Sequence, residues 1–223
     1  MTERGGTGQR HDRRAVRHEV VRQEIIAAAW TLVRVHGLSG LAMRELGERV
    51  GMRAQSIYSY FPSKHTIFDA MFSEGYSLFG AVMEEVRSNA DSSETWNYAR
   101  ALSHAYFEFC VEDPVRFQLL FLRTIPDFVP STESYAIALG VYGSMTKDLT
   151  RIGVNDPQAA DLLTALLTGL VSQQIANDPG GNRWRTLVDR SIEMFLRDCA
   201  PHLATTQTEG RRCRETQTDD QQV

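Results

Sequence analysis

The sequence has few of the features that mark exported, membrane-spanning or disulfide-bonded proteins. Its three cysteines, Cys110, Cys199 and Cys213, lie far apart among 223 residues, and no Cys-x-x-Cys pair occurs. This spacing argues against a disulfide framework or a zinc site and favours reduced thiols. No apolar run reaches the ~18 residues of a transmembrane helix. The polar, basic N-terminus also lacks the apolar segment of a secretory signal. We therefore expect a cytoplasmic protein with no membrane partner and no metal site.

The common signatures of catalysis are missing as well. The sequence contains no glycine-rich phosphate loop, no His-Glu-x-x-His and no Gly-x-Ser-x-Gly. His104 and Cys110 fall in one predicted helix, but their spacing places them on different faces. A Cys–His nucleophile needs the two side chains within hydrogen-bond reach. We therefore expect no enzyme, no catalytic residues and no cofactor.

Charge is unevenly distributed along the chain, although the net charge is only −4. Residues 1–64 hold 11 Lys and Arg against 6 Asp and Glu, whereas residues 65–223 hold 13 against 22. A basic segment on an acidic body suits a protein that offers one part of itself to a polyanion. A basic tail that arose by chance is the alternative.

The basic segment contains a pattern of two short helices joined by a tight turn, over residues 41–64. In the first helix, at about 44–50, Leu46 and Val50 share one face, and Gly47 between them is small enough for another helix to approach. Gly51 supplies a residue that tolerates the positive φ of many helix ends.

The second of these helices is predicted at about 54–60. Its apolar side chains Ile57 and Phe61 are spaced to pack inward, Pro62 stops it, and Ser63 can cap the next helix. Two short helices around a glycine turn form a helix-turn-helix, whose second helix enters the DNA major groove.

The rest of the chain has helical periodicity throughout, with no internal repeat and no reliable strand pattern. We predict an all-α fold with a disordered basic arm at 1–16, a DNA-binding domain at 17–64, a helical domain at 65–201 and a disordered tail at 202–223. The predicted helices outside the helix-turn-helix lie at about 18–36, 63–87, 94–111, 114–121, 135–152, 157–176 and 184–199.

Residues 19–64 resemble the DNA-binding domain of the tetracycline-repressor (TetR) family, and the resemblance covers about a fifth of the sequence. It is carried by residues 25–29, Gly37, residues 43–46, Val50-Gly51 and, most specifically, the ending at 57–64. The resemblance implies a three-helix helix-turn-helix domain followed by a helical domain for ligand binding and dimerisation. Two positions depart from the family pattern. Leu41-Ala42 and Arg53 stand where many members place hydroxyl side chains.

The resemblance also implies DNA contacts. Arg can grip guanine O6 and N7, and Gln can pair with adenine N6 and N7, so Arg44 and Gln55 are candidates for reading bases. The complete predicted set is Arg44, Arg53, Gln55, Ser56, Tyr58, Ser59, Tyr60 and Lys64. Ordinary structural roles are the alternatives. Arg44 could pair with Glu48 on the surface, and the two tyrosines could pack on the first helix.

Arginines in the N-terminal arm could also reach DNA phosphates or a minor groove. A solvated tail without a role explains the same residues equally well. The arginines concerned are Arg10, Arg13, Arg14 and Arg17.

For the helical domain, the resemblance implies an effector pocket and a dimer. Aromatic and sulfur-containing side chains gather between residues 95 and 145, and most of them would serve equally well in an ordinary core. The candidate ligand-binding residues are Trp96, His104, Phe107, Cys110, Phe117, Phe121, Tyr142 and Met145, with Gln118 as a further polar candidate. Helices at about 157–176 and 184–199 would pair with a second copy as a four-helix bundle.

The implied function is a homodimeric repressor that leaves a near-palindromic operator in double-stranded DNA when a small apolar ligand binds. A dimer would place its recognition helices about 34 Å apart, one DNA turn. An activator or a regulator controlled by a protein partner is the alternative in the same class. An all-helical enzyme or small-molecule carrier is the alternative in a different class.

Overall fold

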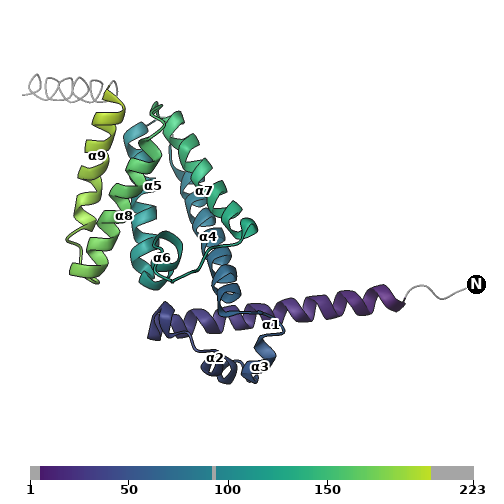
Figure 1. The fold of residues 1–223 in the computed structure, drawn as a ribbon. Coiled ribbons are helices and arrows are strands. Elements are labelled where there is room, and N and C mark those ends of the chain that lie inside the picture. Colours follow the sequence, from purple (N-terminus) through teal and green to yellow (C-terminus); the bar gives the residue numbers. More distant parts are fainter. Residues whose placement is uncertain (1–5, 92–93, 202–223) are drawn as a thin grey trace, which may run out of the picture. The chain divides into compact units, whose positions relative to one another are not determined.

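The computed structural model of this protein describes residues 6–91 and 94–201, and every regular element in these ranges is a helix (Figure 1). The all-α prediction is therefore confirmed. The elements are α1 Gly6–His36, η1 Leu38–Gly40, α2 Met43–Arg49, α3 Ala54–Ile57, α4 Lys64–Asn89, α5 Thr95–Glu112, α6 Pro114–Phe121, α7 Thr132–Arg151, α8 Ala159–Asn177, η2 Arg185–Leu187 and α9 Val188–Cys199. The predicted disordered tail, 202–223, lies outside the described residues.

The described chain forms two compact units. Unit 1 contains the residues up to Ser77 together with Asp113–Ala138, and unit 2 contains Leu78–Glu112 together with the chain from Leu139 onward. These units differ from the domains expected at 17–64 and 65–201. The first half of α4, all of α6 and the start of α7 belong to the unit that contains the helix-turn-helix.

Helix α1 begins earlier than the sequence predicts. We expected a helix from about residue 18 after a disordered arm, whereas α1 already covers residues 6–16. The physical reason is that no proline interrupts residues 6–36 and that Arg and Ala favour helix. Residues 1–5 of the expected arm lie outside the described residues. At its other end α1 stops as predicted, at Gly37 with a φ of 73°.

The helix-turn-helix is assembled around a close backbone contact at Gly47. A side-chain carbon at this position would lie 2.6 Å from the Met52 carbonyl oxygen and 3.0 Å from the Ala54 amide nitrogen. Gly51, with a φ of 68°, makes the turn between α2 and α3. Leu46 and Ile57 close the interior with no exposed surface.

Helix α3 is shorter than the predicted 54–60, because α-helical geometry ends at Ile57 and turns continue to Tyr60. The hydroxyl of Ser59 donates to the Ser56 carbonyl at 2.6 Å. Side-chain bonds of this kind compete with the helical backbone pattern. Phe61 is buried as predicted.

The start of α4 is capped as the sequence predicts. The Thr66 amide donates to Ser63 Oγ at 3.2 Å, and the Ser63 amide donates to Thr66 Oγ1 at 3.2 Å. This reciprocal pair satisfies two backbone amides that the first helical turn leaves without partners. The start of α6 is fixed in the same manner, since Asp113 accepts from the Arg116 amide at 3.1 Å.

A side chain of α1 holds the end of the recognition segment. Arg22 Nη1 donates to the Tyr60 carbonyl oxygen at 2.6 Å, and the guanidinium lies over the Phe61 ring, 4.2 Å from its centroid. His18, one turn earlier, stacks on the Tyr60 ring with 4.6 Å between centroids. The segment after α3 is therefore tied to α1 by one hydrogen bond and two ring contacts.

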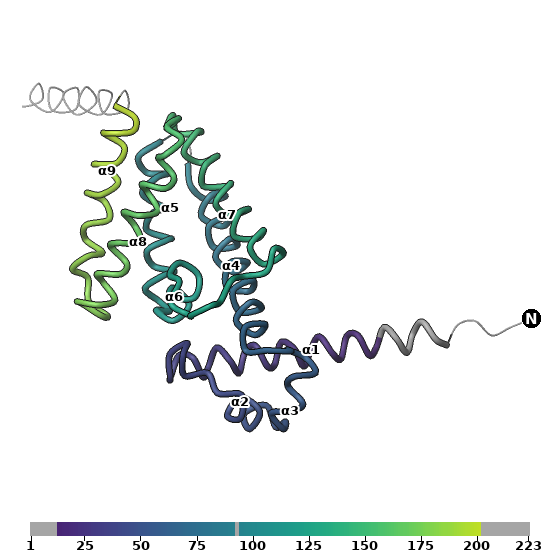
Figure 2. Tube along the Cα trace, in the orientation of Figure 1, coloured from purple at the N-terminus to yellow at the C-terminus, as the bar shows by residue number. Residues whose placement is uncertain are grey.

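In unit 2, helices α5, α8 and α9 lie side by side, as the trace in Figure 2 shows. Asp189 of α9 accepts from Arg100 Nε at 2.8 Å and lies 2.6 Å from His104 Nε2. Burial of Asp189 favours its neutral form, but the bonds from Arg100 and His104 outweigh burial and lower its pKa. Polar pairs thus fix the α5–α9 contact.

A buried polar network joins α4, α5 and α7 within unit 2. Asp148 of α7 accepts from Tyr98 of α5 at 2.7 Å and from Arg87 of α4 at 2.7 Å. Burial and the bond to Asp148 raise the pKa of Tyr98 to about 12. The hydroxyl therefore remains a donor to the carboxylate over the whole physiological pH range.

Helix α8 has an unusual combination of hydropathy and exposure. Within residues 6–91 and 94–201 it is the one helix that is long and apolar enough to cross a membrane, with a mean hydropathy of 1.2. Only 28% of that stretch is buried, and a helix packed in a soluble protein can have the same composition.

The backbone contact at Gly47 predicts that any side chain at this position lowers the stability of the protein. Gly47→Ala forces a methyl group against the backbone of Met52 and Ala54, so the free energy of unfolding should fall by about 1–3 kcal/mol, as in overpacked cores. Urea unfolding followed by circular dichroism measures this change. Gly140→Ala is the control, because no atom lies within 4 Å of its added carbon. That substitution should be neutral or slightly stabilising. Equal effects of the two changes would contradict the proposed contact.

The Arg22 contacts predict a second effect. Arg22→Ala removes the donor to Tyr60 and the cation over Phe61, so unfolding should become easier by about 1–3 kcal/mol. Arg17→Ala, at an exposed position on the same helix, is the matched control and should change stability by less than about 0.5 kcal/mol. Thermal unfolding of both variants at one protein concentration measures the difference, and similar melting temperatures would refute the role of Arg22.

Candidate nucleic-acid interface

The eight residues predicted to touch DNA all lie between the first turn of α2 and the first residue of α4. Six of them are exposed, and Tyr60 and Lys64 are half-buried. The exposed six are Arg44, Arg53, Gln55, Ser56, Tyr58 and Ser59. The helix-turn-helix therefore presents a group of solvent-accessible, mostly polar side chains, while the apolar side chains of the same helices are buried.

Arg44 makes the ion pair that was the alternative to base reading. Its Nε lies 3.4 Å from Glu48 Oε1, while 90% of the Arg44 side chain is exposed. An exposed pair of this kind contributes about 0–1 kcal/mol. A phosphate or a guanine edge can therefore replace Glu48 at little cost, so the pair does not prevent Arg44 from reaching DNA.

Arg53 and Gln55 lie at the start of α3. Arg53 occupies the N-cap position in an extended conformation and makes no side-chain capping bond. The sequence has Arg53 where many members of the family have a hydroxyl side chain, so the absence of a capping bond here agrees with the sequence analysis. The guanidinium is consequently left exposed beside the exposed Gln55.

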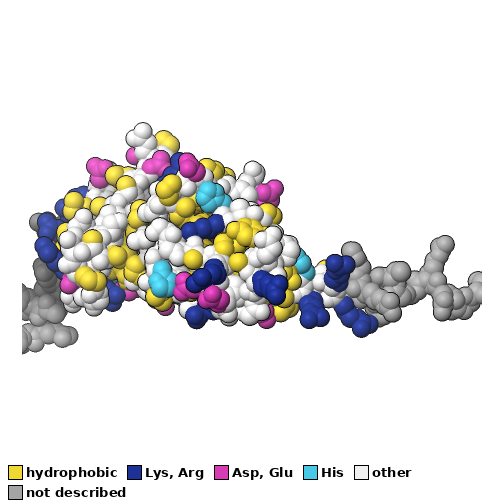
Figure 3. Space-filling model, turned by 60° about the horizontal axis from the view of Figure 1, so that its bottom comes forward, with side chains coloured by type: hydrophobic (Ala, Val, Ile, Leu, Met, Phe, Trp, Pro, Cys, Tyr) yellow, Lys and Arg dark blue, Asp and Glu magenta, His cyan; other side chains and the backbone are white. Residues whose placement is uncertain are grey.

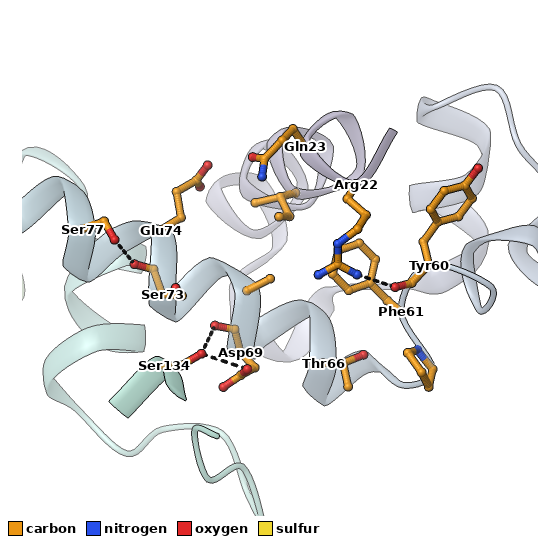
Figure 4. A pocket seen from close by; sticks show the side chains of 13 residues that line it. Arg22, Gln23, Tyr60, Phe61, Thr66, Asp69, Ser73, Glu74, Ser77 and Ser134 are labelled. Atoms are coloured by element: carbon orange, nitrogen blue, oxygen red, sulfur yellow. Dashed lines mark hydrogen bonds between the residues drawn. The ribbon is translucent and has the colours of Figure 1, made fainter. Parts of the chain in front are cut away.

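The two tyrosines have different environments. Tyr58 keeps 42% of its surface exposed. Tyr60 stacks on His18 of α1, which is the packing role that the sequence left as an alternative. Figure 4 shows the Tyr60 hydroxyl pointing away from the ring of Phe61, so its polar end is not used in this packing.

Lys64 is the first residue of α4. Its Nζ donates to the Ser39 carbonyl at 3.2 Å and lies 5.6 Å from the centre of the Phe68 ring. Partial burial lowers the pKa of Lys64. Helix N-termini attract anions through their free amides and dipole, so the charge of Lys64 acts where a phosphate would be favoured.

The outer part of α1 adds further positive charge. Arg13, Arg14 and Arg17 are exposed there, and the side chain of Arg10 lies outside those described. Figure 3 shows Lys and Arg side chains along this part of α1 on the face in view, with Asp and Glu among the charges elsewhere on that face. A helix bearing exposed arginines can approach phosphates.

The sequence did not reveal what holds this interface in place. Arg22 and His18 act on Tyr60 and Phe61 across 38 or more positions of the chain. The only available signal was that Arg22 falls outside the apolar stripe of α1. That position is equally typical of an ordinary solvated arginine.

The eight candidate ligand residues are divided between the units. Phe117 and Phe121 belong to α6 in unit 1, and the other six belong to α5 and α7 in unit 2. Phe107 and Cys110 are almost fully buried. His104 is bonded to Asp189, and the exposed Tyr142 donates to Asp161 at 2.7 Å.

A pocket of about 630 Å³ lies in unit 1, and none of the eight candidate ligand residues lines it. Across residues 6–91 and 94–201, no group of three or more His, Cys, Asp and Glu side chains is arranged to hold a metal ion.

Comparisons with known proteins identify the helix-turn-helix. Residues 25–71 match the family model described as bacterial regulatory proteins, tetR family. The HTH-type transcriptional regulator Mb1846 of Mycobacterium bovis is 22% identical over 138 residues, which cover 61% of this chain. The match spans only 57% of Mb1846, little more than half its length.

Solved structures share the fold. A protein of unknown function from Rhodococcus sp. RHA1 aligns with a TM-score of 0.69 and 19% identity, over 80% of this chain and 95% of its own. FadR from Bacillus subtilis, solved with stearoyl-CoA, aligns with a TM-score of 0.60 and 18% identity, over 78% and 96% of the two chains. With the matched helix-turn-helix, these likenesses confirm the resemblance found in the sequence: residues 25–71 match the DNA-binding domain of the TetR family, and the described chain shares the fold of these solved structures.

Proposed function

We propose that this protein is a DNA-binding transcriptional regulator that acts in the cytoplasm as a homodimeric repressor and leaves its operator when a small apolar ligand binds. The observation that carries the proposal is the exposed set on α2, the turn and α3, within the segment that matches the TetR family. Arg44 and Gln55 have the side chains to read guanine and adenine. The remaining members of the set would position the protein on the phosphates.

A homodimer is supported by the exposed apolar surface of α8 and α9. Leu162 of α8 is 48% exposed and Met194 of α9 is 57% exposed. Little of the apolar stretch of α8 is buried within one chain. A second copy could bury it, and burial of apolar surface is the main favourable term in most protein–protein association. Two helices from each copy would form a four-helix bundle, and the twofold symmetry of the dimer would require a near-palindromic operator.

An apolar effector is supported by the aromatic and sulfur-containing side chains of α5 and α7. Phe107, Cys110 and Met145 supply apolar surface, and Trp96 and His104 supply polar atoms beside it. FadR of Bacillus subtilis, which shares the fold, is known in complex with stearoyl-CoA. A ligand that prefers a state with displaced recognition helices weakens DNA binding by that difference in affinity. Tyr142 of α7 remains part of the same prediction.

The DNA-reading role predicts the outcome of a gel-shift experiment. Arg44→Ala/Gln55→Ala should weaken binding to the DNA upstream of the protein's own gene by at least about tenfold per lost bidentate contact. Non-specific binding at low salt should persist, because the phosphate contacts remain. Lys147→Ala, an exposed basic position on α7, is the control and should bind normally. Unchanged operator affinity of the double variant would remove the proposed base reading.

The proposed dimer predicts that charges placed in its interface reduce the mass of the particle in solution from that of a dimer to that of a monomer. Leu162→Asp/Met194→Asp places two charges in the proposed interface and should give monomers in sedimentation experiments, since buried unpaired charges are costly. Leu139→Asp is the control, because Leu139 is 53% exposed on α7, outside the proposed interface. A wild-type protein that sediments as a monomer at micromolar concentration would contradict the dimer itself.

A further inference from the structure

We infer that the 630 Å³ pocket of unit 1 is a binding site for a small organic diamine, distinct from the effector site proposed above. Its walls come from α1, from residues 60–62 after α3, from the first half of α4 and from Ser134 of α7. All of these residues belong to unit 1. Figure 4 shows polar side chains from α1 and α4 around the hollow.

Three hydroxyl groups that line this pocket already donate their hydrogens within the protein. Ser134 Oγ donates to Asp69 at 2.9 Å, Ser77 Oγ donates to the Ser73 carbonyl at 2.8 Å, and Thr66 Oγ1 donates to the Ser63 carbonyl at 2.7 Å. What these hydroxyls still offer is oxygen lone pairs.

Gln23 adds a further acceptor. Its amide nitrogen donates one of its two hydrogens to Glu19 Oε1 at 2.8 Å, and its carbonyl oxygen stays available. A ligand that brings hydrogen-bond donors can therefore satisfy several acceptors of this pocket at once.

Charge in the pocket selects a cationic donor. Asp69 and Glu74 both line it, and Asp69 already accepts hydrogen bonds from Ser131 and Ser134, which leaves Glu74 as the less occupied carboxylate. Glu74 Oε2 accepts from Trp30 Nε1 at 2.5 Å, and Oε1 has no hydrogen-bond partner among the described residues. The one cation in the lining, Arg22, is committed to the Tyr60 carbonyl and the Phe61 ring. An ammonium group donates charge-assisted hydrogen bonds to carboxylates, and these are about twice as strong as neutral ones.

The apolar part of the lining fits the middle of such a ligand. Ile26 and Phe61 are almost fully buried at the pocket wall, and Ala70 presents a methyl group from α4. A short methylene chain would cover this apolar surface, and its ammonium groups would meet the carboxylate wall of α4 and the free lone pairs of the lining. A volume of about 630 Å³ exceeds what a four-carbon diamine needs.

The site is placed to influence the helix-turn-helix. Tyr60, Phe61 and Pro62 form one of its walls, and Asp69 and Glu74 of α4 form another. A diamine that spans the pocket stabilises the observed spacing between these walls by its own binding free energy. It therefore acts on the recognition segment without entering the C-terminal helices.

The test is isothermal titration calorimetry of the full chain with 1,4-diaminobutane, without DNA, at low ionic strength. We expect saturable 1:1 binding and at least about tenfold weaker binding of 1,4-butanediol, which has the same length without the charges. No saturable binding of the diamine, or equal binding of the diol, would overturn the inference. Because no DNA is present, this result is independent of whether the proposed operator binding holds.

Two variants locate the binding. Glu74→Gln keeps an acceptor for Trp30 but removes the charge, so diamine affinity should fall at least about tenfold. Glu85→Gln makes the same change at an exposed α4 position outside the lining and should leave affinity unchanged. Ser73→Leu fills the pocket while both carboxylates remain, and should abolish binding. Wild-type affinity in either Glu74→Gln or Ser73→Leu would refute the site.

Discussion

The helix-turn-helix depends on the backbone contact at Gly47. The carbonyl of Met52 and the amide of Ala54 approach α2 so closely that no side-chain carbon fits between them. This contact sets the distance from α2 to α3, and Leu46 and Ile57 then close the interior behind it. Since the two short helices are fixed through their backbones and buried side chains, their outward residues are free to be polar. Base reading needs such a rigid platform, because a displaced recognition helix loses several short contacts at once.

Helix α4 connects this platform to the rest of unit 1. The reciprocal bonds of Ser63 and Thr66 fix its first turn, directly after the recognition segment. Further along, the carboxylate of Asp69 accepts from the Ser131 amide at 2.7 Å and from two serine hydroxyls at 2.9 Å, which anchors the start of α7. A displacement of α4 must therefore disturb both the helix-turn-helix and the α7 anchor. Within unit 1, α4 therefore links the recognition segment directly to the start of α7.

The helix boundaries could be predicted because neighbouring residues determine them. The residues that hold the recognition segment in place could not be predicted, because they come from distant parts of the sequence. Gly51 and the predicted helix bounds near residues 36 and 114 marked helix ends in the sequence, and the structure has helix ends close to each of them. The length of α3 was predicted wrongly because the Ser59 hydroxyl competes for a backbone carbonyl, a choice that residue spacing does not reveal. The role of Arg22 and the pocket beside it depend on residues that meet only after folding. The outward face of α2 and α3 could be predicted from the sequence because a short motif fixes their fold, and the DNA contacts proposed on that face stay a prediction.

The uneven distribution of charge determines which part of the chain a polyanion such as DNA attracts. Residues 1–64 carry an excess of Lys and Arg, whereas residues 65–223 hold 13 basic against 22 acidic side chains. A polyanion attracts the first segment and repels the second, so non-productive encounters through the C-terminal helices are suppressed. The attraction is long-ranged but screened within about 8–10 Å at physiological salt, so it orients the protein without specifying a sequence. Under the proposed function, specificity would come from the few outward residues of α2 and α3, of which Arg44 makes a weak ion pair that a guanine or a phosphate can replace.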